Sequence, residues 1–407
     1  MTRQILMAAV AASALAVTPA LAAEYGPGAS DTEIKIGNTM PYSGPASAYG
    51  AIGKAVGACF DKINAEGGIN GRKINFISLD DGYSPPKTVE QTRKLVEREE
   101  VLGVVTGLGT PTNSAVHRYL NQKKVPQLFV ATGATKWGDP EQYPWTMGWQ
   151  PNYQTEGRIY ANYLLQTKPD AKIAILYQTD DYGKDYVKGM KDGLGDKAES
   201  MIVAEESYEV TDPTIDSQII NLQNSGANVF YNVTTPKFAA QAIRKVADLG
   251  WKPLHLLNSV SNSVGAVLKP AGFEKSVDVI SALYLKDPTD PAWEADPDYK
   301  EWLAWMNEYY ADGDKTDTFN AYGWGNCHTI AQVIRQMGDT VTRENFVKQA
   351  ASLKDFQAPM LLPGITINTS ATDFFPIEQM QLVKFDGTEW VRFGEVLSAG
   401  KETGSGS

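Results

Sequence analysis

Short apolar runs alternate with longer amphipathic segments along the chain. Four runs of about seven mostly apolar residues have the length of buried strands, and the segments between them have apolar residues at helical spacing. The runs lie at 33–40, 73–79, 101–107 and 126–132, and the predicted helices lie at 49–66, 88–100 and 114–124. This β-α-β-α-β-α-β order predicts a parallel sheet covered by helices on both faces.

A second round of alternating elements follows. Its predicted strands lie at 172–178, 201–208, 228–233, 254–258 and 277–284, and its predicted helices at 154–167, 182–194, 214–225 and 236–249. Helices at 298–310, 319–337 and 343–353 come next, then short strands at 364–368, 379–385 and 389–393. No Pro- or Ser-rich linker separates the rounds, so we expect two doubly wound α/β lobes. Ligands bind at the carboxyl ends of such sheets, which predicts a cleft between the lobes.

The two ends of the chain are not expected to belong to this fold. Residues 1–22 have one early cation, Arg3, then an apolar run at 5–17 and a small-x-small site ending at Ala22. This is the pattern of a cleaved signal peptide, and the run is too short to span a membrane. We expect cleavage after Ala22 and export to a bacterial periplasm. Residues 403–407 resemble a linker and are left out of the fold.

Composition excludes several classes of function. The 407 residues include 37 Lys and Arg against 48 Asp and Glu, a net charge of −11. Nucleic-acid binding is therefore not expected, because phosphate contacts need clustered cations. The three histidines have no metal-ligand spacing, so neither a metal nor a cofactor is predicted. An oxidising compartment permits a disulfide between Cys59 and Cys327, but the sequence leaves their distance open.

Two strand-to-helix loops have polar groups suited to a small ligand. The loop 107–114 begins like a dinucleotide motif, but Thr112 replaces the third glycine and Pro111 removes a backbone donor. Thr110 and Thr112 instead fit a helix N-terminus that binds a carboxylate, or a plain helix cap. In the next loop, Gly133 would let a ligand approach the backbone, and Thr135 adds a hydroxyl.

Aromatic residues gather near the predicted strand ends. They could wall an apolar slot or simply pack in the core. The residues concerned are Tyr49, Trp149, Tyr153, Tyr182 and Tyr284. No nucleophile with a neighbouring base and no P-loop occurs, so we do not expect an enzyme.

Several segments in order resemble one known family. The segments 34–50, 63–74, 125–135 and 174–185 are similar to type 1 periplasmic binding proteins, and most to the leucine/isoleucine/valine-binding branch of ABC-importer receptors. The resemblance implies two lobes joined by three crossings that close on a ligand. Lobe one would be 24–150 plus 284–370, and lobe two 151–283 plus 371–400.

The resemblance also implies a set of site residues. In lobe one these are the ring of Tyr49, a polar residue near Thr110 or Thr112, the backbone at Gly133 and the hydroxyl of Thr135. In lobe two they are Tyr182, a residue near Thr234 or Thr235, and the position of Ser259. Amino-acid binders of the family have an acid at this last position, which pairs with the ligand's α-ammonium.

Serine in place of the acid changes the expected ligand. A buried ammonium without a counter-charge is costly, so we expect a carboxylate-bearing ligand without an α-amino group. An aromatic acid of benzoate or hydroxycinnamate type fits best. A hydrophobic amino acid is the alternative, with Asp180 or Asp181 supplying the missing charge.

We therefore predict a monomeric receptor that delivers a small-molecule ligand to the permease of an ABC importer. A ligand-sensing module for a regulatory partner is a second alternative, and an exported enzyme a third.

Overall fold

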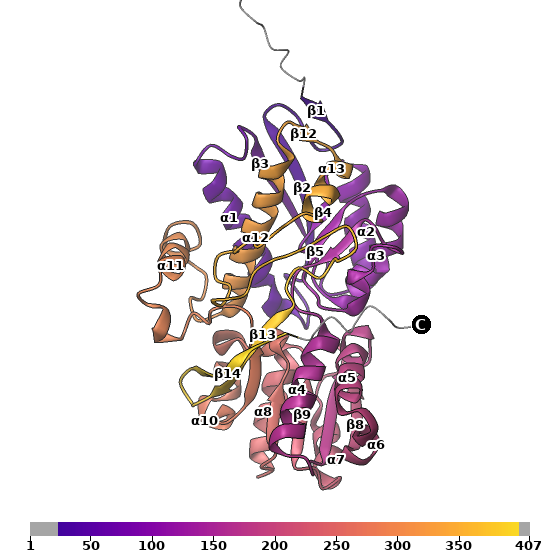
Figure 1. Ribbon diagram of the computed structural model, residues 1–407, viewed down its shortest axis with the longest axis vertical. Coiled ribbons are helices and arrows are strands. Elements are labelled where there is room, and N and C mark those ends of the chain that lie inside the picture. The colour runs from indigo at the N-terminus through magenta and orange to yellow at the C-terminus, as the bar shows by residue number, and fades with distance from the viewer. Residues whose placement is uncertain (1–22, 399–407) are drawn as a thin grey trace, which may run out of the picture.

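The computed structural model describes residues 23–398, so the predicted signal peptide and the tail at 403–407 lie outside the described residues. Within that range the chain forms two α/β lobes, one above the other in Figure 1. The upper lobe contains a parallel sheet in the order β3 (Lys73–Asp80), β2 (Glu33–Met40), β4 (Val104–Val105), β5 (Gln127–Val130) and β6 (Thr146–Gly148). A pair of short strands, β1 (Glu24–Tyr25) and β12 (Thr340–Val341), lies at its top.

The lower lobe repeats the same winding and adds an antiparallel hairpin. Its seven strands run in the order β14 (Trp390–Ser398), β13 (Gln379–Phe385), β11 (Ile280–Leu283), β10 (Leu254–Leu257), β9 (Val229–Val233), β7 (Ile173–Gln178) and β8 (Ile202–Tyr208). All neighbours are parallel except where β13 pairs with β11 and with β14. The two windings match strand for strand. In the upper sheet β2 lies between the edge strand β3 and β4, and in the lower sheet β7 lies between the edge strand β8 and β9.

The chain crosses between the two sheets three times, as expected. It leaves the upper sheet after β6, returns after β11 and enters the lower sheet again at β13. The upper helices are α1 (Gly50–Ala65), α2 (Pro85–Glu97), α3 (Thr110–Lys123), α11 (Pro297–Tyr309), α12 (Thr318–Met337) and α13 (Arg343–Ala350). The lower helices are α4 (Tyr153–Thr167), α5 (Asp181–Leu194), α6 (Ala198–Met201), α7 (Asp216–Asn224), α8 (Pro236–Asp248), α9 (Lys269–Ala271) and α10 (Phe273–Ser276). The residue numbers at which the lobes divide stay a prediction.

Local sequence explains where several helices begin. The Asn152 side chain accepts from the N–H groups of Gln154 and Thr155, at 2.8 and 3.4 Å, and so caps α4. Asp180 caps α5 in the same way. A proline in the first turn starts α2, α3 and α8. These residues satisfy or remove N–H groups that a helix start leaves unpaired, which fixes where the helices meet the cleft.

Two predicted strands are corrected by the structure. The strand expected at 101–107 is reduced to β4, and Thr106, directly after it, has a positive φ of 55°. The strand expected at 364–368 is a loop with a single bridge between Phe356 and Ile367. Ile365 and Ile367 are fully buried, so the apolar alternation was a sign of core packing under a loop.

A disulfide joins α1 to α12. Cys59 and Cys327 are bonded and both fully buried, although 268 residues separate them in sequence. The bond therefore fastens the late, returning helix to the first helix of the same lobe (Figure 1).

Removing this bond is expected to destabilise the protein. The double substitution Cys59→Ser/Cys327→Ser should lower the free energy of unfolding by about 2–5 kcal/mol, because the unfolded chain regains the entropy of a long open loop. Urea denaturation of both proteins measures the difference. Dithiothreitol should lower the midpoint of the wild type and leave that of the double variant unchanged; equal stability of the two oxidised proteins would contradict the expectation.

Candidate ligand-binding cleft

A cleft lies where the carboxyl ends of the two sheets face each other. It contains about 690 Å³ of empty space, part of it open to solvent. Residues that follow five different strands line it: Thr110 after β4, Ala131 after β5, Tyr182 after β7, Thr235 after β9 and Ser259 after β10. Parallel strands direct their carboxyl ends to one edge, so the two windings bring these distant loops together.

The upper wall includes the start of α3. Gly109 precedes the helix with φ 91°, and a Cβ at this position would lie 2.4 Å from the ring of Tyr83. Only glycine fits both constraints. This tight turn brings the Gly109 backbone and Thr110 to the cleft, where the first-turn N–H groups of α3 provide a partial positive charge.

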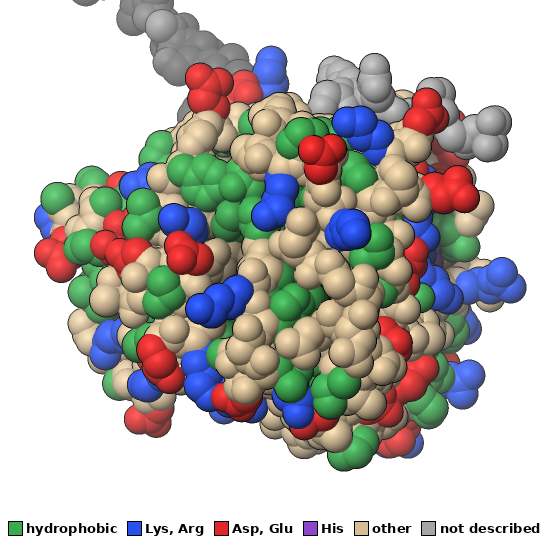
Figure 2. Space-filling view, turned by 90° about the horizontal axis from the view of Figure 1, so that it is seen from below, with side chains coloured by type: hydrophobic (Ala, Val, Ile, Leu, Met, Phe, Trp, Pro, Cys, Tyr) green, Lys and Arg blue, Asp and Glu red, His purple; other side chains and the backbone are tan. Residues whose placement is uncertain are grey.

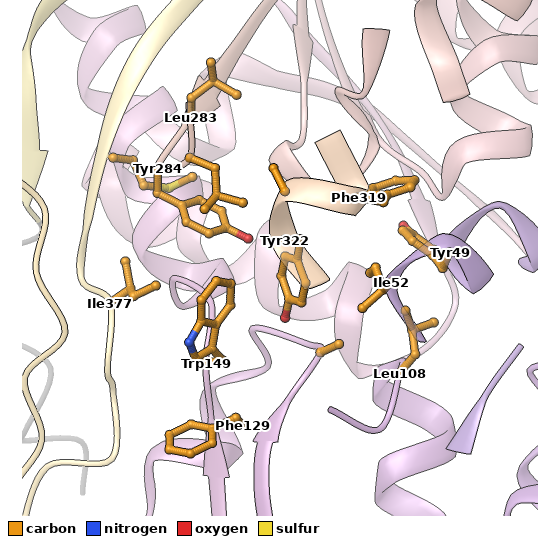
Figure 3. Close-up of a cluster of buried hydrophobic side chains, with 14 of the residues drawn as sticks. Tyr49, Ile52, Leu108, Phe129, Trp149, Leu283, Tyr284, Phe319, Tyr322 and Ile377 are labelled. Carbon is orange, nitrogen blue, oxygen red and sulfur yellow. The ribbon is translucent and has the colours of Figure 1, made fainter. Parts of the chain in front are cut away.

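Seven aromatic residues line the cleft, together with aliphatic side chains such as Ile52, Leu108 and Leu283. The aromatic residues are Tyr49, Tyr83, Tyr153, Tyr182, Tyr284, Phe319 and Tyr322. Figure 3 shows Tyr49 beside Phe319 and Tyr284 beside Tyr322 around the same space. Burial raises the pKa of the six tyrosines above its ordinary value, so their hydroxyls are neutral at physiological pH.

Within the described part of the chain, no Asp, Glu, Lys, Arg or His side chain lines the cleft. The acids proposed as substitutes are engaged elsewhere: Asp180 caps α5, and Asp181 forms an ion pair with Lys136 at 2.7 Å. An acid does lie behind Ser259. It is Glu156 on α4, 1% exposed, which accepts from the Ser259 backbone N–H at 2.7 Å and from the Ser259 hydroxyl at 2.6 Å.

Six of the predicted site residues line the cleft and five do not. Those on the wall are Tyr49, Thr110, Tyr153, Tyr182, Ser259 and Tyr284. Those away from it are Thr112, Gly133, Thr135, Trp149 and Thr234.

Close packing explains the position of Gly133. A Cβ there would lie 2.2 Å from the carbonyl oxygen of Pro151 and 2.8 Å from the ring of Tyr153. The Tyr153 N–H also donates to the Gly133 carbonyl at 2.8 Å. The Cβ side and the carbonyl of Gly133 thus face the start of α4, and a ligand contact of its backbone stays a prediction.

Thr135 has its polar groups engaged by the lower lobe. Its N–H donates to Asp185 Oδ2 at 2.7 Å, and its hydroxyl donates to Asn152 Oδ1 at 3.1 Å. Together with the Lys136–Asp181 pair, these bonds join the upper loop to α4 and α5. The loop therefore fastens the two lobes together beside the cleft.

The other three residues also point into the protein. The Thr112 hydroxyl donates to the carbonyls of Leu108 and Gly109, as a first-turn threonine often does. The Thr234 hydroxyl donates to Asn232 Oδ1 at 2.6 Å, and its neighbour Thr235 reaches the cleft instead. Trp149 lies behind the wall, edge-on to Tyr322 at 4.7 Å between ring centroids (Figure 3).

Sequence reasoning missed several lining residues. Tyr83 and Gln150 follow β3 and β6, and Thr318, Phe319 and Tyr322 belong to the start of α12. The strand-end pattern could have indicated Gln150 and Tyr83, because both come shortly after a predicted strand. The α12 residues gave no local signal, because only the second crossing brings that helix to the cleft.

A direct contact between the lobes crosses the cleft. The Tyr49 hydroxyl, in the upper lobe, donates to the carbonyl oxygen of Val260, in the lower lobe, at 3.0 Å. Since Tyr49 is only 7% exposed, this bond is shielded from water.

Asp317 caps α12 next to the cleft. It accepts from the Phe319 N–H at 3.0 Å and from the Ser263 hydroxyl at 2.8 Å. Burial raises its pKa to about 6, because no cation compensates the desolvated charge. The folded protein therefore binds this proton more tightly than the unfolded chain does.

The substitution Asp317→Asn is expected to change how stability depends on pH. In the wild type, the cost of burying the charge grows as pH rises from about 4 to about 6, and reaches up to about 3 kcal/mol of unfolding free energy. Asparagine can still cap the helix but carries no charge. The free energy of unfolding of the variant, measured in urea titrations, should therefore rise relative to that of the wild type between about pH 4 and about pH 6. Asp216→Asn is the control, because Lys245 lowers the pKa of that carboxyl and its contribution has the opposite sign. Parallel pH profiles of Asp317→Asn and the wild type would contradict the assignment.

The face seen from below carries charges of both signs (Figure 2). Figure 2 shows Lys and Arg mixed with Asp and Glu on the face seen from below, which gives no strong field of one sign there. No group of three His, Cys, Asp or Glu side chains within residues 23–398 could hold a metal ion. Over the same range, no helix has both the length and the apolar character needed to cross a membrane.

Two α/β lobes, three crossings and a cleft between them define a ligand-binding protein of the periplasmic type. The sequence profile of the family described as "Periplasmic binding protein" matches residues 33–389. The chain therefore belongs to the periplasmic binding protein family. Its members are binding proteins and not enzymes, and the family implies a location outside the cytoplasm.

Relatives and solved structures agree with this membership. "Leu/Ile/Val-binding protein homolog 1" of Brucella suis is 26% identical over 324 residues, which cover 78% of this chain and 82% of the relative. A branched-chain amino acid ABC transporter structure from Thermus thermophilus with bound valine has a TM-score of 0.81 at 15% identity, covering 91% of this chain and 97% of that one. A fatty acid ABC transporter substrate-binding protein from Thermomonospora curvata has a TM-score of 0.77 at 22% identity, covering 93% and 95%. These two structures share the fold with ligands of different chemistry.

Proposed function

We propose that this protein is a receptor that captures a small aromatic carboxylate, of benzoate or hydroxycinnamate type, and delivers it to an ABC importer. One observation carries the proposal. The cleft is walled by seven aromatic rings and several hydroxyl groups, without a charged side chain on its surface. Such a wall favours a flat apolar ligand, because rings gain from stacked and edge-on contacts.

The start of α3 is suited to the ligand's carboxylate. Gly109 and Thr110 line the cleft at this helix start, where the helix dipole favours a negative charge; the Thr110 hydroxyl also bonds to the Thr132 hydroxyl at 2.6 Å. This arrangement binds an anion with neutral donors, so it needs no Lys or Arg.

An α-ammonium group would meet no charged side chain at the opposite wall. The resemblance to the family implies that Ser259 replaces the acid of the amino-acid binders, and Glu156 behind it is shielded and already accepts several hydrogen bonds. Bringing an ammonium into this neutral wall would remove its water without supplying a direct counter-charge. This supports a ligand without an amino group.

A branched-chain or other hydrophobic amino acid is the second candidate. The names of the Brucella relatives and the valine in the Thermus thermophilus structure favour it. The same two observations, with the fatty acid receptor, support delivery to an ABC importer. Closure of the lobes on the ligand would present the shape that a permease recognises.

Matched ligands that differ only in the ammonium group test the proposal. We expect 3-phenylpropanoate to bind more tightly than L-phenylalanine, and 4-methylpentanoate more tightly than L-leucine, each by about tenfold or more, because the cleft provides no counter-charge. Isothermal titration calorimetry on the protein without its signal peptide measures the affinities, and a rise in melting temperature supports them.

Phenylpropanol, which lacks the carboxylate, is the control and should bind weakly. Tighter binding of leucine, valine or phenylalanine than of their deaminated analogues would overturn the proposal and favour the amino-acid candidate.

A further inference from the structure

Several hydroxyl groups that line the cleft donate their hydrogen bond to other groups of the protein. The Ser259 hydroxyl donates to Glu156 Oε2 at 2.6 Å, and that of Thr318 donates to Asp287 Oδ2 at 2.8 Å. The hydroxyls of Tyr49 and Tyr322 donate to the Val260 carbonyl and to Gln150 Oε1, each at 3.0 Å. A hydroxyl has one proton and two lone pairs, so each of these groups can only accept a hydrogen bond from a ligand.

The direction of the Ser259 hydroxyl is fixed most firmly. Glu156 accepts from the Ser259 N–H and hydroxyl and from the Tyr186 hydroxyl at 2.7 Å, and at 3.0 Å it shares the single proton of the Tyr160 hydroxyl with the carbonyl oxygen of Leu257. An ionised carboxylate only accepts, and its two oxygens offer about four lone-pair positions. The donors from Ser259 and Tyr186 thus engage both oxygens of Glu156 as acceptors and direct the Ser259 proton toward the carboxylate, although burial raises the pKa of Glu156.

Position in the fold strengthens this arrangement. Glu156 lies in the first turn of α4, where the helix dipole favours a negative charge. Its partners come from α4, α5 and the end of β10, so the carboxylate cannot turn away without breaking bonds in three elements. Ser259 is thus held as a hydrogen-bond acceptor on the lower wall, while the anion-binding start of α3 lies on the upper wall.

We propose that Ser259, oriented by Glu156, accepts a hydrogen bond from a phenolic hydroxyl at the end of the ligand opposite its carboxylate. This inference rests on the proposed function and narrows the ligand class to hydroxylated aromatic acids. Glu156 acts as a positioning residue, because it does not line the cleft and affects the ligand only through Ser259.

Ligands that differ at the hydroxyl test the inference. We compare cinnamate, its 2-, 3- and 4-hydroxy derivatives and the matching methoxy ethers by calorimetry. In the wild type, at least one hydroxy isomer should bind about tenfold or more tighter than cinnamate, and its ether should lose that gain because it has no proton to donate.

Two variants separate the roles of the residues. Ser259→Ala should abolish the hydroxyl gain and leave the affinity for cinnamate within about threefold. In Glu156→Gln, the new amide can donate to the Ser259 oxygen and release the serine proton into the cleft. The hydroxy acid should then lose its advantage and the methoxy ether should gain, an inversion that a simple loss of packing would not produce.

Ser263→Ala is the matched control. The Ser263 hydroxyl is buried and also donates to a carboxylate, Asp317, at 2.8 Å, but it does not line the cleft. The preference for the hydroxy acid should be unchanged in this variant. Circular dichroism and melting curves confirm folding, and Ser259→Ala decides the test if Glu156→Gln does not fold.

The outcomes distinguish this inference from the proposed function. If cinnamate and its hydroxy isomers bind equally well, or the gain survives in Ser259→Ala, the inference is wrong and the proposed function stands. If none of these acids binds and phenylalanine or leucine binds in a manner that depends on Ser259, both are wrong, and the acceptor serves an ammonium.

Discussion

The cleft exists because parallel strands can end only at one edge of their sheet. Each winding directs its strand ends, and the loops that follow them, toward the other lobe. Thr110 and Ser259 lie on opposite walls for this reason, although they belong to different sheets and are far apart in sequence. The second crossing returns the chain to the upper lobe, and the Cys59–Cys327 bond holds α12 against α1. The start of α12 therefore completes the wall of the cleft.

Two acidic side chains lie behind the cleft wall and do not reach its surface. Glu156 and Asp287 are buried next to lining residues and accept from hydroxyl groups that reach the cleft. Each acid orients a neutral group and does not meet the ligand itself. A wall of this kind distinguishes ligands by hydrogen-bond direction and by ring shape, and it penalises an uncompensated charge.

The contacts between the lobes are of two kinds. Tyr49 donates to Val260 inside the cleft, whereas Thr135 and Lys136 bond to Asp185 and Asp181 at its edge. The buried bond is worth more than the exposed ion pair, because solvent screens surface charges. Opening of the lobes would break both, so a ligand that bridges the walls would shift the population toward the closed form.

Much of the fold was predictable from the sequence alone, because it follows from local patterns. Apolar runs and helical spacing gave the strands and helices, and the resemblance of ordered segments gave the two lobes with their crossings. Positions at strand ends and turns indicated Tyr49, Thr110, Tyr153, Tyr182 and Tyr284, and the family resemblance added Ser259; all six line the cleft.

Tertiary structure decided what long-range packing controls. Gly133 and Thr135 have the residue types of a ligand loop, yet the Cβ side and the carbonyl of Gly133 face the start of α4, and the Thr135 N–H donates to Asp185. Thr318, Phe319 and Tyr322 reach the cleft only because α12 returns to the first lobe. Glu156 had no motif around it, and its role depends on donors from three separate elements. A sequence pattern indicates which face of a helix or strand is apolar. It does not indicate which side chains pack against that face, because these come from segments that are distant in the sequence.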